Sequence, residues 1–63
     1  MAWVAIDKDG IEYIYQFRPK RSIDMFVSIS EYSIWLALPK GSIKKLIGRN
    51  LTWEDNPVEL KEE

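Results

Sequence analysis

The side chains available for acid–base chemistry in this chain of 63 residues are carboxylates, because the sequence contains no histidine and no cysteine. Their absence excludes thiol chemistry, disulfide bonds, histidine catalysis and zinc sites of the Cys/His kind. No Gly-x-Ser-x-Gly motif and no phosphate-binding loop supplies a nucleophile. The carboxylates that could form pairs lie in a turn, in the C-terminal tail or at strand positions expected to face outward: Glu54, Asp55, Glu62, Glu63, Glu12, Glu31 and Glu59. We therefore expect no enzyme, no catalytic residue and no cofactor.

One acidic segment, residues 7–12, begins like a calcium-binding loop. Such a loop needs glycine at its sixth position and a bidentate glutamate at its twelfth. Counted from Asp7, the sixth position is Glu12 and the twelfth is Arg18, so the spacing fails at both. We expect no metal site here, and instead a hairpin turn in which Gly10 has a positive φ.

Positive charge is concentrated in the middle of the chain. Residues 18–49 hold seven basic and two acidic side chains, a net of +5, whereas the whole chain carries −1. With Tyr32 and Trp35 nearby, this stretch could bind single-stranded nucleic acid by neutralising phosphates and stacking bases. Nucleic acid is the less favoured partner, because the overall charge gives no long-range attraction. The candidate residues are Arg18, Lys20, Arg21, Lys40, Lys44, Lys45 and Arg49.

Aromatic residues make up 13% of the chain and include three tryptophans. We expect at least two tryptophans to fill the core. Because one helical turn cannot cover both faces of a sheet, some aromatic surface should stay exposed and bind a protein partner or a second copy. The candidate partner-binding residues are Trp35 and Phe26. A shift of one residue in strand register would instead bury Trp35 and expose its neighbours Ile34 and Leu36.

Short strands must position these residues. Residues 2–6 and 11–17 flank the Asp-Gly turn and predict a hairpin, since residues 11–17 alternate with a period of two. Pro19 breaks the pattern. Strands are then expected at residues 23–29, with Ile23, Met25, Val27 and Ile29 on one face, and from about 32 to 38.

The C-terminal part predicts one helical turn over residues 42–47, with Ser42 as its N-cap and Gly48 as its left-handed stop. Residues 50–53 predict a short strand or, with Thr52 as a cap, a helical turn. Residues 58–60 alternate as a last strand.

Four to five short strands with one late helical turn predict a mainly β fold, either a small curled antiparallel sheet or an SH3-like barrel. The alternative is an α+β meander with one helix packed on the sheet. A chain this short is expected to form a single small domain over residues 1–63. The sequence shows no secretory signal and no long apolar run, so we expect a cytoplasmic location and no membrane partner.

The segment 38–60, LPKGSIKKLIGRNLTWEDNPVEL, resembles the ending of a set of short bacterial and phage-type proteins without an assigned activity. These proteins also tend to carry a tryptophan and then Asp-Lys-Asp-Gly near the start, as Trp3 and residues 7–10 do here. Residues 18–37 lie outside the resemblance. It implies a small bacterial or phage-type protein and transfers no functional residue.

Overall fold

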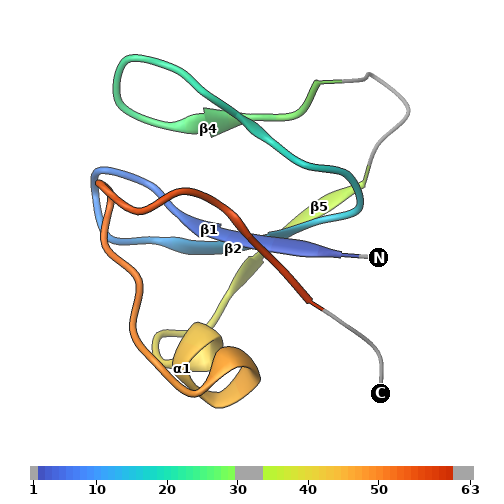
Figure 1. Cartoon of the computed structure of the whole chain (residues 1–63). Coiled ribbons are helices and arrows are strands. Elements are labelled where there is room, and N and C mark those ends of the chain that lie inside the picture. The colour runs from blue at the N-terminus through green and yellow to red at the C-terminus, as the bar shows by residue number, and fades with distance from the viewer. Residues whose placement is uncertain (1, 30–33, 61–63) are drawn as a thin grey trace.

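The structure is a computed structural model that describes residues 2–29 and 34–60. The main sheet has four antiparallel strands in the spatial order β5-β2-β1-β6. These strands are β1 (Trp3–Ile6), β2 (Glu12–Tyr15), β5 (Trp35–Leu38) and β6 (Val58–Glu59). A separate two-stranded ribbon pairs β3 (Lys20–Arg21) with β4 (Phe26–Val27), and α1 is Ser42–Ile47. The ribbon lies on one side of the sheet and α1 on the other (Figure 1).

The fold is mainly β with a curled antiparallel sheet, as the sequence predicted, and the sheet is not closed into a barrel. β5 and β6 are its two edges, and no pairing joins them within the described residues. Six strands occur there instead of four to five, because residues 18–29 fold back and pair with themselves. No helix in residues 2–29 and 34–60 has the length and hydrophobicity needed to cross a membrane.

The opening hairpin is confirmed, with Trp3 opposite Tyr15 and Ile6 opposite Glu12. The Gly10 N–H donates to the Asp7 carbonyl at 2.9 Å, and the Asp7 N–H donates to the Ile11 carbonyl at 3.0 Å. Residues 8–10 therefore form a three-residue loop, which ends in a glycine of left-handed conformation. Gly10 has the predicted positive φ, 90°.

The strand predicted over residues 23–29 is wrong in length and orientation. Only Phe26–Val27 pairs, and its partner lies in the segment that Pro19 was expected to break. Phe26 is 3% exposed, whereas Ile23 is 92% exposed and the other three residues predicted to share its face are also exposed. The reason is tertiary: the Phe26 N–H donates to Asp7 Oδ1 at 2.9 Å, and its ring centroid lies 5.3 Å from that of Trp53.

The predicted strand 32–38 is observed as β5, which begins at Trp35. Five residues named in the sequence analysis lie outside the described residues: Glu31, Tyr32, Ser33, Glu62 and Glu63. Most of β5 is exposed on both faces, and Leu38 at its end packs against a buried cluster. Trp35 is 53% exposed, and its neighbours Ile34 and Leu36 are 65% and 61% exposed. One of these two faces was expected to be buried, but most of each is exposed, because β5 is an edge strand with a neighbour on one side only.

The helix occurs where it was predicted, and Gly48 ends it with a φ of 80°. The N-cap is Gly41 and not Ser42, whose hydroxyl donates to the Pro39 carbonyl at 2.6 Å. Residues 52–55 form a turn rather than a strand, in which the Asp55 N–H donates to the Thr52 carbonyl at 3.0 Å.

Each side of the sheet has its own core. The helix-side core consists of Val4, Ile43 and Leu51, with partly buried aliphatic residues packed against it. The ribbon-side core consists of Ala5, Tyr15 and Phe26, with Trp3, Tyr13 and Trp53 packed against it. Side chains alternate between the faces of a strand, so β1 and β2 contribute to both cores. Two tryptophans thus pack against the core, as predicted.

Candidate functional site

A cavity of about 240 Å³ lies on the ribbon side of the sheet. Its walls come from the end of β1, from β2 and β5, and from the ribbon. We call it the aromatic pocket, and it is lined by Asp7, Tyr13, Tyr15, Met25, Phe26, Val27, Ser28 and Trp35.

Strand geometry gathers the aromatic rings of this pocket. Tyr13 and Tyr15 are two residues apart on β2 and so share a face. The register between β2 and β5 places Trp35 opposite Tyr15 and Ala37 opposite Tyr13. The ring of Tyr13 meets that of Trp35 edge to face, with centroids 5.7 Å apart and an interplanar angle of 68°. Such pairs stabilise by about 0.5–1.5 kcal/mol beyond the burial of their area.

Asp7 is the charged residue in the wall of the aromatic pocket. Asp7 is 5% exposed, and its carboxylate accepts the Phe26 N–H through Oδ1. Burial raises the pKa of Asp7, the hydrogen bond from Phe26 opposes that rise, and the nearby charges of Asp9 and Asp24 add to it. A carboxylate in such surroundings is stabilised by any cation that enters the pocket.

The Tyr15 hydroxyl donates to the Phe26 carbonyl at 3.4 Å. Burial raises the pKa of Tyr15, and the charges of Asp7 and Tyr13 raise it further. The phenol therefore stays protonated at neutral pH and acts as a hydrogen-bond donor. Asp7 thus offers an acceptor, while the single Tyr15 O–H is already donated to Phe26, and neither is an activated nucleophile of the kind that covalent catalysis uses.

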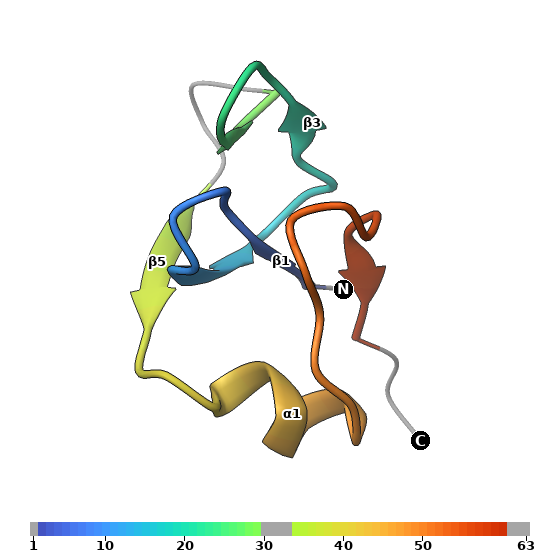
Figure 2. The same cartoon turned by 90° about the vertical axis from the view of Figure 1, so that its left-hand side faces the viewer.

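The second notable surface is the outer edge of β5. The Gln16 N–H donates to the Ile34 carbonyl at 2.8 Å. Because bonded residues alternate along an antiparallel pair, residues 34, 36 and 38 direct their backbone groups toward β2. Trp35 and Ala37 then direct theirs outward, where no strand of the described chain pairs with them. Figure 2 shows β5 at the margin of the molecule.

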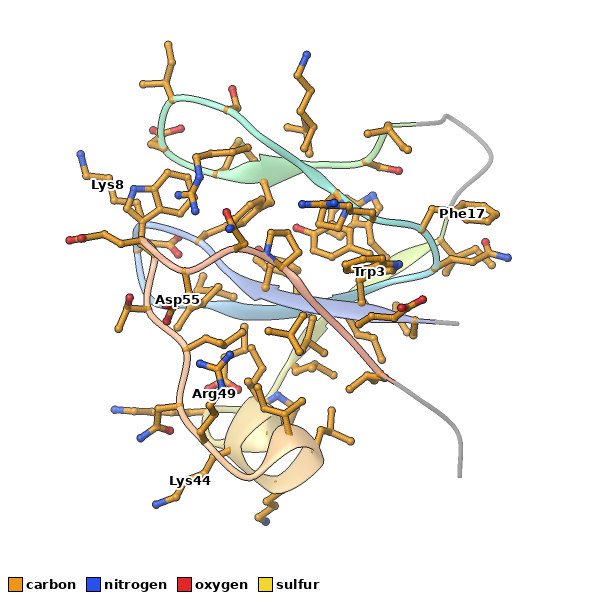
Figure 3. The ribbon with its side chains drawn as sticks, viewed as in Figure 1. Trp3, Lys8, Phe17, Lys44, Arg49 and Asp55 are labelled. Carbon is orange, nitrogen blue, oxygen red and sulfur yellow. The ribbon has the colours of Figure 1, made fainter. Side chains whose placement is uncertain are left out.

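The structure separates the seven basic residues proposed for nucleic acid. Arg18, Lys20 and Arg21 lie in or beside the ribbon, whereas the other four lie in or next to α1 on the opposite side of the sheet. Figure 3 shows Lys44 and Arg49 at that helix end. The four residues at the helix end are Lys40, Lys44, Lys45 and Arg49.

Two of the arginines are engaged within the molecule. The Arg21 guanidinium lies 4.8 Å from the ring centroid of Phe26 and 4.5 Å from that of Trp53. It also donates to the carbonyls of Trp53 and, at 2.8 Å, Asp55. The Arg18 guanidinium lies 5.4 Å from the ring centroid of Trp3. These contacts hold the C-terminal turn and the first strand against the ribbon.

Of the two residues predicted to bind a partner, Trp35 is accessible and Phe26 is a buried wall of the aromatic pocket. Sequence reasoning missed Tyr13 and Asp7. The alternation that places Tyr13 beside Tyr15 was visible, and it could have indicated an aromatic face. Asp7 gave no such signal, because aspartate before a turn is ordinarily solvent-exposed.

In the part of the chain that the structure describes, no three potential metal-ligating side chains gather in one place. No family model, no curated protein and no solved structure matches the chain. The aromatic pocket and the open edge of β5 are the two candidate sites of this chain.

Proposed function

We propose that this protein is a non-enzymatic protein-interaction module that uses the open edge of β5, and that the occupant of this edge is a second copy of the chain. The observation that carries the proposal is the exposure of three consecutive large apolar side chains, Ile34, Trp35 and Leu36, on a strand with one unpaired edge. Exposed, uncharged edge strands readily accept another strand.

The side chains of β5 suit pairing about a two-fold axis. If two copies pair antiparallel with Leu36 at the axis, Trp35 of one copy lies opposite Ala37 of the other. Both residues direct their backbone groups outward, so this pair can exchange hydrogen bonds. The small Ala37 side chain leaves room for the indole. Residues 34–38 carry no charge that would repel an identical strand.

The chemistry of the ribbon side supports a binding role rather than catalysis. The raised pKa of Tyr15 removes it as a base, and the aromatic pocket is smaller than the roughly 300 Å³ from which small-molecule sites begin. The separation of the basic residues across the sheet weighs against a continuous phosphate-binding surface.

Sedimentation of matched variants tests the proposal. Wild-type protein should show concentration-dependent dimers. Ala37→Pro removes an outward N–H and should abolish them, whereas Ala37→Thr keeps the N–H and should retain them. Trp35→Ala should weaken dimers and leave the circular dichroism spectrum unchanged.

A wild-type monomer at millimolar concentration would overturn the second-copy proposal, as would a folded Ala37→Pro protein that dimerises normally. An oligonucleotide titration tests nucleic acid as the competing partner. Sub-micromolar binding at about 0.15 M salt, where the screening length is about 8 Å, would favour the basic residues over β5.

A further inference from the structure

Arginine guanidinium groups of this chain pack against its aromatic rings on the ribbon side of the sheet. The Arg21 guanidinium lies over both Phe26 and Trp53, and its donors reach backbone carbonyls. Arg18 lies over Trp3. Guanidinium groups suit such places because they are planar, weakly hydrated and attracted to aromatic faces. Two arginines thus pack against aromatic rings on the ribbon side of the sheet.

The aromatic pocket has the rings of this arrangement without the arginine. Phe26 is a wall of it, together with Tyr13, Tyr15 and Trp35. No arginine or lysine is among the described residues that line it. In their place the wall contains the buried carboxylate of Asp7.

We infer that the aromatic pocket binds the guanidinium group of an arginine side chain supplied by a protein partner, with the Asp7 carboxylate as its counter-ion. This inference goes beyond self-association at the β5 edge and does not depend on it. The two sites share Trp35, whose backbone groups belong to the open β5 edge and whose side chain lines the aromatic pocket between β2, β5 and the ribbon.

The size of the pocket favours a single side chain. Its volume of about 240 Å³ is smaller than the roughly 300–1,000 Å³ of sites that enclose whole small molecules. An extended arginine can reach such a cavity from a partner's surface with its apolar stem against Met25 and Val27, both of which line the pocket.

The charge of the pocket favours a cation. An ionised carboxylate that is buried without a cation is costly, and Asp7 is buried among aromatic rings with Asp9 and Asp24 as its charged neighbours. A guanidinium compensates that charge and can donate to the carboxylate oxygens through its fork of N–H groups. A neutral apolar side chain would fill the same space and leave the Asp7 charge uncompensated.

A titration with blocked tripeptides tests this inference by two-dimensional NMR. The probe is Gly-Arg-Gly, and the matched peptide carries citrulline, which keeps the shape of arginine and lacks its charge. The arginine peptide should cause saturable shifts of the Tyr13 amide and the Trp35 indole N–H. The citrulline peptide should bind at least about tenfold more weakly, as expected for the loss of a charged hydrogen-bond partner.

Two variants locate the binding. Asp7→Asn keeps an oxygen that can accept the Phe26 N–H and removes the charge, so arginine affinity should fall about tenfold. Glu54→Gln removes one charge from an exposed side chain outside the pocket and should leave the affinity unchanged.

The inference is overturned if the arginine peptide causes no saturable shifts, if citrulline binds equally well, or if folded Asp7→Asn binds arginine like the wild type. The peptide comparison uses wild-type protein, so it decides even if Asp7→Asn fails to fold. Repeating the titration on monomeric Ala37→Pro separates the two proposals, since arginine binding should persist there without dimers.

Discussion

On the helix side of the sheet, the buried Glu12 carboxylate accepts two backbone N–H groups, from Gly41 and Ile43, each at 2.7 Å. On the ribbon side, the buried Asp7 carboxylate accepts the Phe26 N–H. Glu12 uses both of its oxygens to hold the start of α1 against the sheet. Asp7 anchors the ribbon through Oδ1 and also lines the aromatic pocket. The contrast separates a carboxylate whose two oxygens are both bonded within the fold from one that also lines a cavity.

The largest expected effect on stability comes from removing the Glu12 carboxylate on the helix side. Glu12→Ala should lower the free energy of unfolding by about 3 kcal/mol, because two N–H groups lose a charged acceptor and hydrogen bonds to charged groups contribute about 1.5–3 kcal/mol each. Such a loss is a large fraction of the total free energy of unfolding of a domain of this size. Urea unfolding measures it.

Glu54→Ala is the matched control, since Glu54 is exposed, and it should change the free energy by less than about 0.5 kcal/mol. A Glu12→Ala loss as small as the control's would show that water replaces the carboxylate at no cost. The hydrogen bonds of Glu12 would then not stabilise the packing of α1 against the sheet.

The two carboxylates also show what sequence reasoning could reach. The hairpin, the helix at residues 42–47 and the left-handed Gly10 and Gly48 follow from signals within a few residues, and all were predicted. Glu12 was expected to face outward, because strand alternation gives its face but not what covers that face. Its partners at Gly41 and Ile43 lie far along the chain, where no local pattern points back to it.

The candidate site was predictable only in part. Trp35 was proposed as a surface residue, with its burial kept as the alternative, whereas Phe26 was placed on the same kind of exposed surface and is buried. Its orientation depends on Asp7 and Trp53, which come from two distant segments. The alternation in residues 23–29 therefore did not predict which side chains are buried, because one buried hydrogen bond and one aromatic contact determine the orientation of Phe26.

A smaller effect on the free energy of unfolding is expected from replacing the glycines in the turns beside the two carboxylates. Gly10 follows Asp7 and has a φ of 90°, and Gly41 donates to Glu12 and has a φ of 91°. A Cβ at either position meets nothing within 4 Å. Gly10→Ala and Gly41→Ala should therefore each cost about 1 kcal/mol, from backbone conformation alone.

Thermal or urea unfolding of the two alanine variants checks this equality. Gly48→Ala, at a φ of 80° and also with open space around a Cβ, is the matched reference at the C-terminal end of α1. If Gly41→Ala costs much more than the other two, the Glu12 contact depends on the geometry of Gly41. An unchanged stability of Gly10→Ala would show that the first turn relaxes without its left-handed residue.

The smallest expected effect is the contribution of Asp7, on the ribbon side, to the pH dependence of the free energy of unfolding. Burial raises the pKa of Asp7 above its ordinary value of 3.8, and Asp9 and Asp24 raise it further. The unfolded chain then releases this proton at a lower pH than the folded chain does. Between the two pKa values the folded state holds more protons, so the contribution of Asp7 to stability falls as pH rises and is constant above that window.

Asp7→Asn removes this titration and nearly preserves shape. The difference in unfolding free energy, wild type minus Asp7→Asn, should therefore decrease as pH rises from about 3.5 through the window, because the other carboxylates titrate in both proteins and largely cancel. Glu54→Gln should give no such decrease. A difference that grows with pH would mean that the Phe26 hydrogen bond outweighs burial. Asp7 would then resemble Glu12, a carboxylate satisfied by the fold, and the contrast between the two sides of the sheet would disappear.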